Sequence, residues 1–120
     1  MRRLAACLLF LVVACSTGAV SDRYFLDEWA VDGPERLPAG TDTITAENNG
    51  EWSHTLVVTT EDGHVVAASG LIESGAMTTL DVSLEPGPYV ISCRIVAQDD
   101  EGGLSDHYER GMNHRVMVET

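Results

Sequence analysis

The chain of 120 residues contains little cysteine and no lysine. Two of its three cysteines, Cys7 and Cys15, lie close to the N-terminus, so Cys93 is the only thiol in the rest of the chain. This count excludes a disulfide framework in the folded part. The seven basic residues are all arginine, against 19 acidic residues, and the formal net charge is −12. Such an acidic surface repels phosphate backbones, which excludes nucleic acid as a partner.

Long apolar runs are also absent, except at the start of the chain. Two arginines precede an apolar stretch from Leu4 to Ala14, which is too short for a transmembrane helix and typical of a secretory signal. The stretch ends in LVVAC, with Cys15 last, and this resembles a bacterial lipoprotein signal. The resemblance implies that Cys15 becomes the lipidated N-terminus. The alternative is an ordinary signal peptide in which Cys15 has no role.

We therefore expect three parts: a lipoprotein signal peptide over 1–14, a small polar tether over 15–22, and one domain over 23–120. Removal of the signal leaves five basic and 19 acidic residues, a net charge of −14. The lipid would hold the protein in the cell membrane, on the outer side of the cytoplasmic membrane.

Amphipathic helical periodicity is missing from the domain. Short runs of alternating or β-branched residues are instead separated by turn residues, among them NNG, EDG and EPG. The runs predicted to be strands are 24–31, 42–47, 54–60, 64–68, 77–84, 89–96 and 115–118. About seven to eight short strands with regular turns predict an all-β fold, a Greek-key sandwich of two sheets.

Four side chains that bind soft metals follow one another along this domain: His54, Cys93, His107 and Met112. Two imidazoles, a thiolate and a thioether form the ligand set of a blue-copper site. Taken singly, the histidine could begin a strand, and the thiol and thioether could fill the core. Together, in this order, they favour one copper ion that alternates between Cu(I) and Cu(II). His114 is the alternative to His107.

Three segments around these residues resemble the cupredoxins, the family of plastocyanin, azurin and amicyanin. LEPGPYVISC, which ends at Cys93, is similar to their L-x-P-G-x-Y-x-x-x-C run. NGEWSH, which ends at His54, is similar to N-G-x-x-x-H, and HYERGM, which ends at Met112, to H-x-x-x-G-M. The resemblance covers about 24–120. It implies a cupredoxin fold, a type 1 copper site and electron transport.

The resemblance also implies residues that support the ligands. Thr55, which follows the first histidine, would donate its backbone N–H to the Cys93 sulfur, and Asn49 of the N-G pair would lie nearby. One departure stands out, because cupredoxins commonly place the second histidine two to four residues after the cysteine. Here 94–106 intervene. We expect this insertion to form a hairpin that has an acidic tip and rises over the copper pole.

These observations predict an electron carrier and not an enzyme, because neither a second metal cluster nor an acid–base constellation is visible. Its partners would be redox proteins, with a basic docking surface to match the acidic chain. We expect a monomer. Two alternatives remain: a copper chaperone or storage protein with the same fold, and a metal-free sandwich that acts as a binding module.

Overall fold

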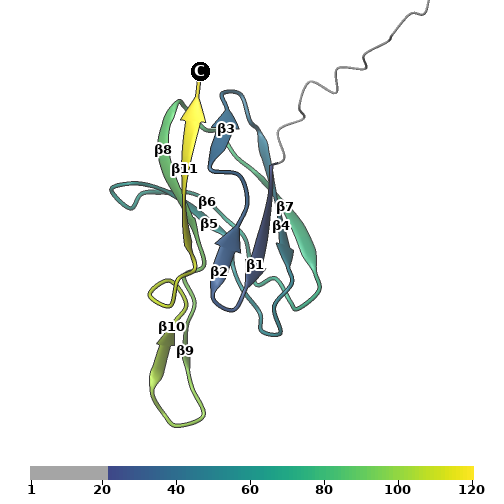
Figure 1. Cartoon of the computed structure of the whole chain (residues 1–120), viewed down its shortest axis with the longest axis vertical. Helices are drawn as coiled ribbons and strands as arrows, with labels where there is room; N and C mark the ends of the chain where they lie inside the picture. Colours follow the sequence, from purple (N-terminus) through teal and green to yellow (C-terminus); the bar gives the residue numbers. More distant parts are fainter. Residues whose placement is uncertain (1–21) are drawn as a thin grey trace, which may run out of the picture.

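In a computed structural model, which describes residues 22–120, two β-sheets pack face to face and a hairpin projects from one end (Figure 1). One sheet has the order β2-β1-β4-β7, formed by β1 (Arg23–Asp27), β2 (Ala30–Asp32), β4 (Thr43–Asn48) and β7 (Met77–Asp81). The other has the order β3-β11-β8-β5-β6, formed by β3 (Arg36–Pro38), β5 (Val57–Thr60), β6 (Val65–Ala68), β8 (Gly87–Ser92) and β11 (Asn113–Glu119). The hairpin consists of β9 (Val96–Gln98) and β10 (Leu104–Asp106).

The all-β sandwich expected from the sequence is confirmed, but residues 22–120 contain eleven strands and not seven to eight. The run expected as one strand over 24–31 is divided, because Glu28 and Trp29 form a turn and Asp27 pairs with Ala30. The short strands β3, β9 and β10 contain too few residues for a visible alternation. No helix in residues 22–120 is long and apolar enough to cross a membrane.

The pairing of the strands is mixed. β1 pairs with β4, and β3 with β11, in parallel, whereas the other pairs are antiparallel. Because β8 pairs with β11 along six register positions, the chain that leaves β8 at Ser92 and the chain that enters β11 at Asn113 lie side by side. Everything between these two residues is therefore presented at one end of the sandwich.

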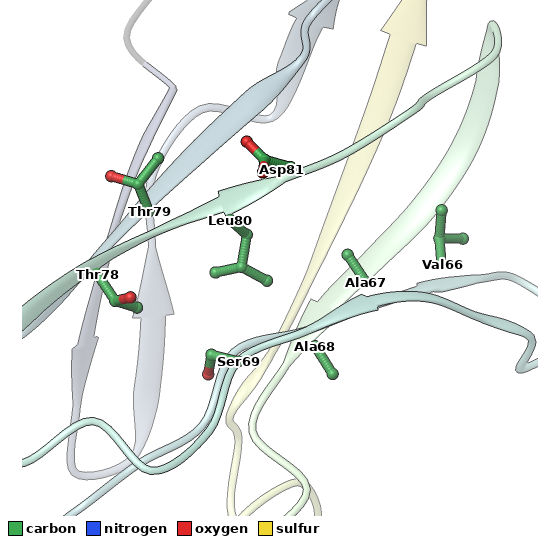
Figure 2. A pocket seen from close by; sticks show the side chains of 8 residues that line it. All are labelled: Val66, Ala67, Ala68, Ser69, Thr78, Thr79, Leu80 and Asp81. Carbon is green, nitrogen blue, oxygen red and sulfur yellow. The ribbon is translucent and has the colours of Figure 1, made fainter.

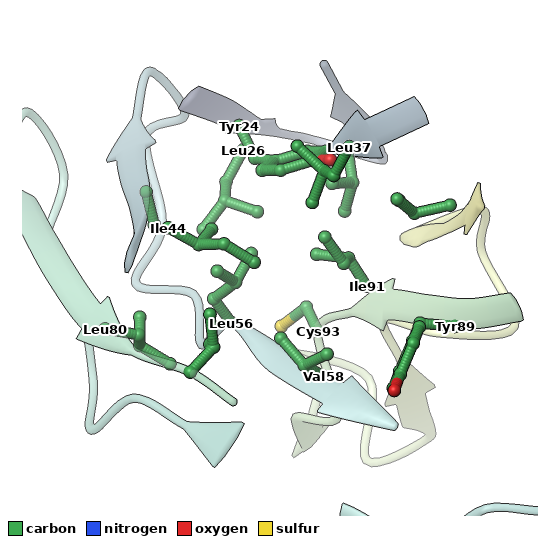
Figure 3. Close-up of a cluster of buried hydrophobic side chains, with 14 of the residues drawn as sticks. Tyr24, Leu26, Leu37, Ile44, Leu56, Val58, Leu80, Tyr89, Ile91 and Cys93 are labelled. Atoms are coloured by element: carbon green, nitrogen blue, oxygen red, sulfur yellow. The ribbon is translucent and has the colours of Figure 1, made fainter. Parts of the chain in front are cut away.

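The core lies between the two sheets and is filled by alternate residues of their strands (Figure 3). In β4, for example, every second residue is buried, as expected for a strand with one face on the core. Fully buried members include Tyr24, Leu26, Ile44, Leu56 and Val58. The Cys93 thiol belongs to the same cluster and is also fully buried. The core therefore shields this sulfur from water.

The edge strands β6 and β7 border a groove of about 370 Å³ (Figure 2). Its lining is mainly small or hydroxyl-bearing, with Asp81 as the one charged residue among the eight that line it. None of these eight is a histidine, cysteine or methionine. This groove contributes no side chain to the cluster of ligands described next.

Candidate metal centre

Three side chains far apart in the sequence meet at the end of the sandwich from which the hairpin projects. His54 lies in a loop and is joined to Ile72 by an isolated β-bridge; Cys93 follows β8, and His107 follows β10. All three are buried, and one candidate ligand atom from each lies within 4.8 Å of the others. Although a strand was predicted from 54, β5 begins only at Val57.

The spacing of the three ligand atoms fits a metal ion. Nδ1 of His54 lies 3.3 Å from Nδ1 of His107, and the Cys93 sulfur lies 3.9 and 3.6 Å from these two nitrogens. The point equidistant from the three atoms is about 2.1 Å from each, close to the length of metal bonds to protein nitrogen and sulfur ligands. A thiolate with two imidazoles matches the trigonal ligand set of a blue-copper site.

Met112 completes this set through the backbone of the same loop. Its N–H donates to the His107 carbonyl, and its carbonyl accepts the Cys93 N–H, both at 3.1 Å. The side chain is fully buried and belongs to the same apolar cluster as the cysteine. The cluster of His54, Cys93, His107 and Met112 is typical of a type 1 copper site.

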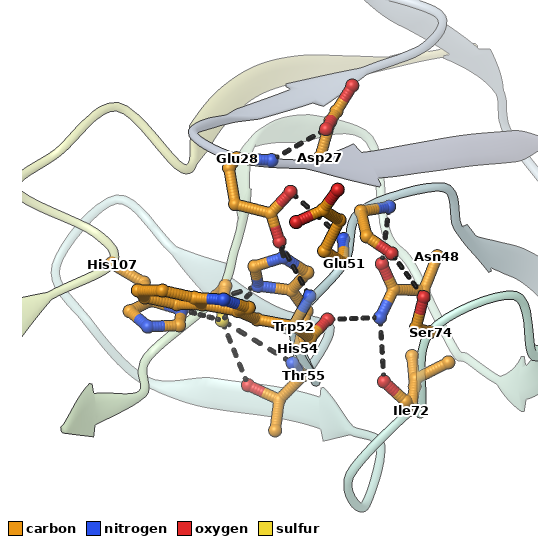
Figure 4. A network of polar contacts seen from close by, with 12 residues as sticks. Asp27, Glu28, Asn48, Glu51, Trp52, His54, Thr55, Ile72, Ser74 and His107 are labelled. Carbon is orange, nitrogen blue, oxygen red and sulfur yellow. Dashed lines mark hydrogen bonds and ion pairs between the residues drawn. The ribbon is translucent and has the colours of Figure 1, made fainter.

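A carboxylate contacts the His54 imidazole on its Nε2 side, whereas Nδ1 faces the other ligand atoms (Figure 4). The Nε2–H of His54 donates to Oε1 of Glu28 at 3.0 Å. A carboxylate only accepts, so the proton is on Nε2 and the Nδ1 lone pair is available to a metal. Partial burial alone would raise the pKa of Glu28, but backbone N–H groups of Trp52 and Glu51, together with His54, lower that pKa to about 2. The carboxylate is therefore charged at neutral pH.

A glycine at position 50 leaves room for this carboxylate. A Cβ atom at Gly50 would lie 2.5 Å from Oε1 of Glu28, closer than real Cβ contacts. The same turn gives Glu28 its two backbone donors, the N–H of Trp52 at 2.9 Å and that of Glu51 at 3.1 Å. The N-G pair of the sequence thus ends in a glycine that lets the 49–53 loop wrap around the carboxylate.

Asn48, and not Asn49, organises this loop (Figure 4). Its buried amide donates to the carbonyls of Trp52 and Ile72, each at 2.8 Å, and accepts the Gly50 N–H at 2.9 Å. Asn49, the residue predicted to support the ligands, has an exposed side chain and donates its backbone N–H to Leu26. The alternation along β4 explains the correction, because it turns residue 48 inward and 49 outward.

Thr55 contacts the Cys93 sulfur twice. Its backbone N–H lies 3.4 Å and its hydroxyl 3.6 Å from Sγ. The hydroxyl also accepts the backbone N–H of Arg94 at 3.4 Å. Thr55 therefore directs two donors at the candidate sulfur ligand and ties Cys93 to the segment that follows it.

Beyond the contacts of its Nδ1 with the other ligand atoms, His107 is held by aromatic rings. Trp29 packs edge-on at a centroid distance of 4.8 Å, and Trp52 lies tilted at 6.4 Å. The side chain is 2% exposed, and its Nε2 has no hydrogen-bond partner among residues 22–120. Burial, then His54 and Arg110, lower the pKa of His107. The imidazole is therefore neutral, the form that binds a metal.

No protein-family model matches this chain, and no curated protein matches it. Solved structures do: reduced auracyanin from Roseiflexus castenholzii superposes with a TM-score of 0.61 at 19% identity, over 82% of this chain and 95% of auracyanin. An azurin from Methylomonas sp. strain J has a TM-score of 0.57 and 13% identity, and the match covers 82% of this chain and 96% of the azurin. A reduced Cu(I) form of amicyanin has a TM-score of 0.53 and 17% identity, and the match covers 81% of this chain and 80% of amicyanin. The chain has the cupredoxin fold.

The insertion after Cys93 forms the hairpin predicted for it, with its turn closed by Asp99, whose carboxylate accepts the N–H groups of Glu101 and Gly103. Contrary to the expectation from the sequence, the hairpin does not rise over the pole. It extends away from the sandwich (Figure 1), and the rings in contact with His107 are those of Trp29 and Trp52. β9 and β10 pair antiparallel along three register positions, from Val96 with Asp106 to Gln98 with Leu104.

His114 is not part of the cluster. Its Nε2 lies 3.1 Å from the carbonyl of Pro34, and its ring packs edge-on against Tyr24. Glu28 was not predicted as a site residue, because the local sequence placed it only within an apparent strand. The break at Glu28 and Trp29 becomes visible only once β2 has folded back onto β1.

Proposed function

We propose that this chain is a mononuclear type 1 copper protein that carries single electrons between redox proteins. The observation that supports this most directly is the triangle of His54 Nδ1, Cys93 Sγ and His107 Nδ1, whose sides of 3.3, 3.9 and 3.6 Å leave room for one ion. A copper ion bound there would supply one-electron chemistry by alternating between Cu(I) and Cu(II).

The protein's own residues would support repeated transfer of one electron by keeping the ligands in place. The ligands lie in loops that the strands of the sandwich and the hairpin hold at their ends, so the geometry need not change between oxidation states. Glu28 keeps Nδ1 of His54 unprotonated, and Thr55 donates to the Cys93 sulfur. The apolar surroundings of Cys93 and Met112 exclude water from the site.

One visible spectrum tests the proposal. The oxidised, copper-loaded protein should show an intense absorption from charge transfer between the Cys93 thiolate and copper. The variant Cys93→Ser should lose this absorption, because a hydroxyl is a hard and poorly ionised ligand. A copper-loaded protein without the absorption, or a variant that keeps both colour and copper, would contradict the assignment.

We also propose that Cys15 carries a lipid that anchors the protein on the outer side of the cytoplasmic membrane. The support is the LVVAC sequence, which lies outside the described residues, and the start of β1 at Arg23, which leaves 15–22 as a tether. The variant Cys15→Ala should appear in the soluble fraction or keep its signal peptide. Unchanged membrane attachment and mass would rule the anchor out.

The partners that suit this surface are redox proteins with a basic docking face. The support is charge: the chain has 19 acidic and seven basic residues, and complementary potentials accelerate association. Electron exchange with a basic cytochrome should therefore slow as salt is added, and with an acidic one it should not.

A further inference from the structure

A cavity of about 430 Å³ lies between the projecting hairpin and the loop that precedes His54. Trp52 lines it from the loop, and Asp99, Asp100 and Ser105 line it from the hairpin. It is separate from the metal centre, because none of the four metal ligands lines it.

Ser105 indicates that this cavity receives a polar group. The residue is 3% exposed, and its hydroxyl has no hydrogen-bond partner among the described residues. A buried hydroxyl without a partner is unfavourable, and a ligand that reaches it would supply the missing hydrogen bond.

The other walls define the chemistry of that group. Trp52 is 51% exposed, so much of its indole is open to a ligand. Asp99 and Asp100 supply negative charge, and only the former has its carboxylate occupied by the hairpin turn. Aromatic face, carboxylates and a hydroxyl together suit a flat cation with several donors. An arginine guanidinium has these properties, whereas a lysine ammonium lacks the planar surface for stacking.

We propose that this cavity binds an arginine side chain on the surface of the protein's redox partner. The guanidinium would stack on Trp52 and donate hydrogen bonds to the Ser105 hydroxyl and the Asp100 carboxylate.

This inference rests on the proposed function, because docking at the cavity matters for electron transfer only if the nearby centre holds copper. The Trp52 ring centroid lies 6.4 Å from that of His107, and His107 itself is buried. A partner docked through this cavity would face the metal centre across a single indole ring. The acidic hairpin would then serve as a docking element and not as a cover.

The experiment is an NMR titration of the full processed chain in detergent, metal-free and Cu(I)-loaded, with N-acetyl-arginine amide. N-acetyl-citrulline amide is the matched probe, since it has the same shape without the charge. We expect saturable shifts of the Trp52 indole N–H and the Ser105 amide with arginine, and binding weaker by about two- to fivefold with citrulline.

Variants localise the effect. Asp100→Asn and Ser105→Ala should each weaken arginine binding by about two- to fivefold. Glu85→Gln, an exposed carboxylate in the turn before β8, is the charge-matched control and should leave binding unchanged. Equal response to both probes, equal weakening by Glu85→Gln, or no saturable shift at residues 52 and 105 would overturn the proposal.

The two proposals fail separately. If the chain forms no blue copper site but its metal-free form binds arginine as described, the cavity assignment stands and the proposed function falls. If the blue site forms and arginine does not bind, only the cavity assignment falls.

Discussion

The two histidines of the metal centre are held in different ways. His54 is fixed by a hydrogen bond to Glu28, whose carboxylate is in turn fixed by two backbone N–H groups. His107 has no such partner at Nε2 and is enclosed by the rings of Trp29 and Trp52. One half of the site is therefore positioned by directional polar bonds and the other by packing.

The difference separates two requirements of such a centre. A hydrogen bond sets the tautomer and the electron density of an imidazole, so it acts on the metal. Aromatic packing does not choose the tautomer, but it excludes water and leaves a ring between the ligand and the surface. Polar substitutions should thus change the electronic properties of the site, and aromatic substitutions its stability and access.

The largest effect is expected where packing is removed. Trp29→Ala should lower the free energy of unfolding by about 2–4 kcal/mol, because a half-buried indole in contact with His107 and Arg110 is lost. Trp52→Ala is the matched control and should cost less than about 1 kcal/mol, since half of that ring is already exposed. Urea denaturation of the metal-free protein measures both. Equal losses would contradict the distinction.

Glu28→Gln should weaken metal binding by about tenfold or more and raise the reduction potential. The amide still fills the space, but it removes a negative charge beside His54, which disfavours the more positive Cu(II) state. Glu51→Gln removes the same charge from an exposed neighbour whose backbone, not side chain, contacts Glu28. Competition titration and voltammetry compare the two. If both variants change copper affinity and reduction potential equally, the hydrogen bond between His54 and Glu28 does not support the metal centre.

The same carboxylate predicts a dependence of stability on pH. Because folding lowers the pKa of Glu28 from 4.5 to about 2, its stabilisation is complete above about pH 4.5 and is lost as pH falls toward 2. Over that window the metal-free parent should lose stability faster than Glu28→Gln, which cannot titrate there. Parallel unfolding curves for the two proteins would show that the hydrogen bonds to this carboxylate do not stabilise the fold.

The smallest effect on the metal centre is expected from the hairpin. Replacing Gln98 to Leu104 by a tight turn should leave the blue absorption intact, because the ligands lie outside the deleted segment. Electron exchange with a basic cytochrome should slow and lose part of its salt dependence, since exposed charges act over about 8 Å at physiological salt. An unchanged rate would show that the hairpin takes no part in docking.

Much of this architecture was predictable from short stretches of sequence. Turn residues between alternating runs predicted the sandwich, because alternation with a period of two is a local property of a half-buried strand. The order of His54, Cys93, His107 and Met112 predicted the ligand set, because donor chemistry belongs to each residue wherever it lies. The length of the insertion after Cys93 likewise predicted a hairpin.

Only the tertiary structure decided how those ligands are supported. Glu28 reaches His54 across 26 positions of sequence, and Trp29 reaches His107 across 78. Both contacts depend on where β1 ends against β2 and β4, which no short window of sequence contains. The choice of Asn48 over Asn49 follows from the face that β4 turns to the core, and one residue of register reverses it. The sequence by itself determined which atoms can bind a metal; the sheet registers decided which neighbours hold those atoms in place.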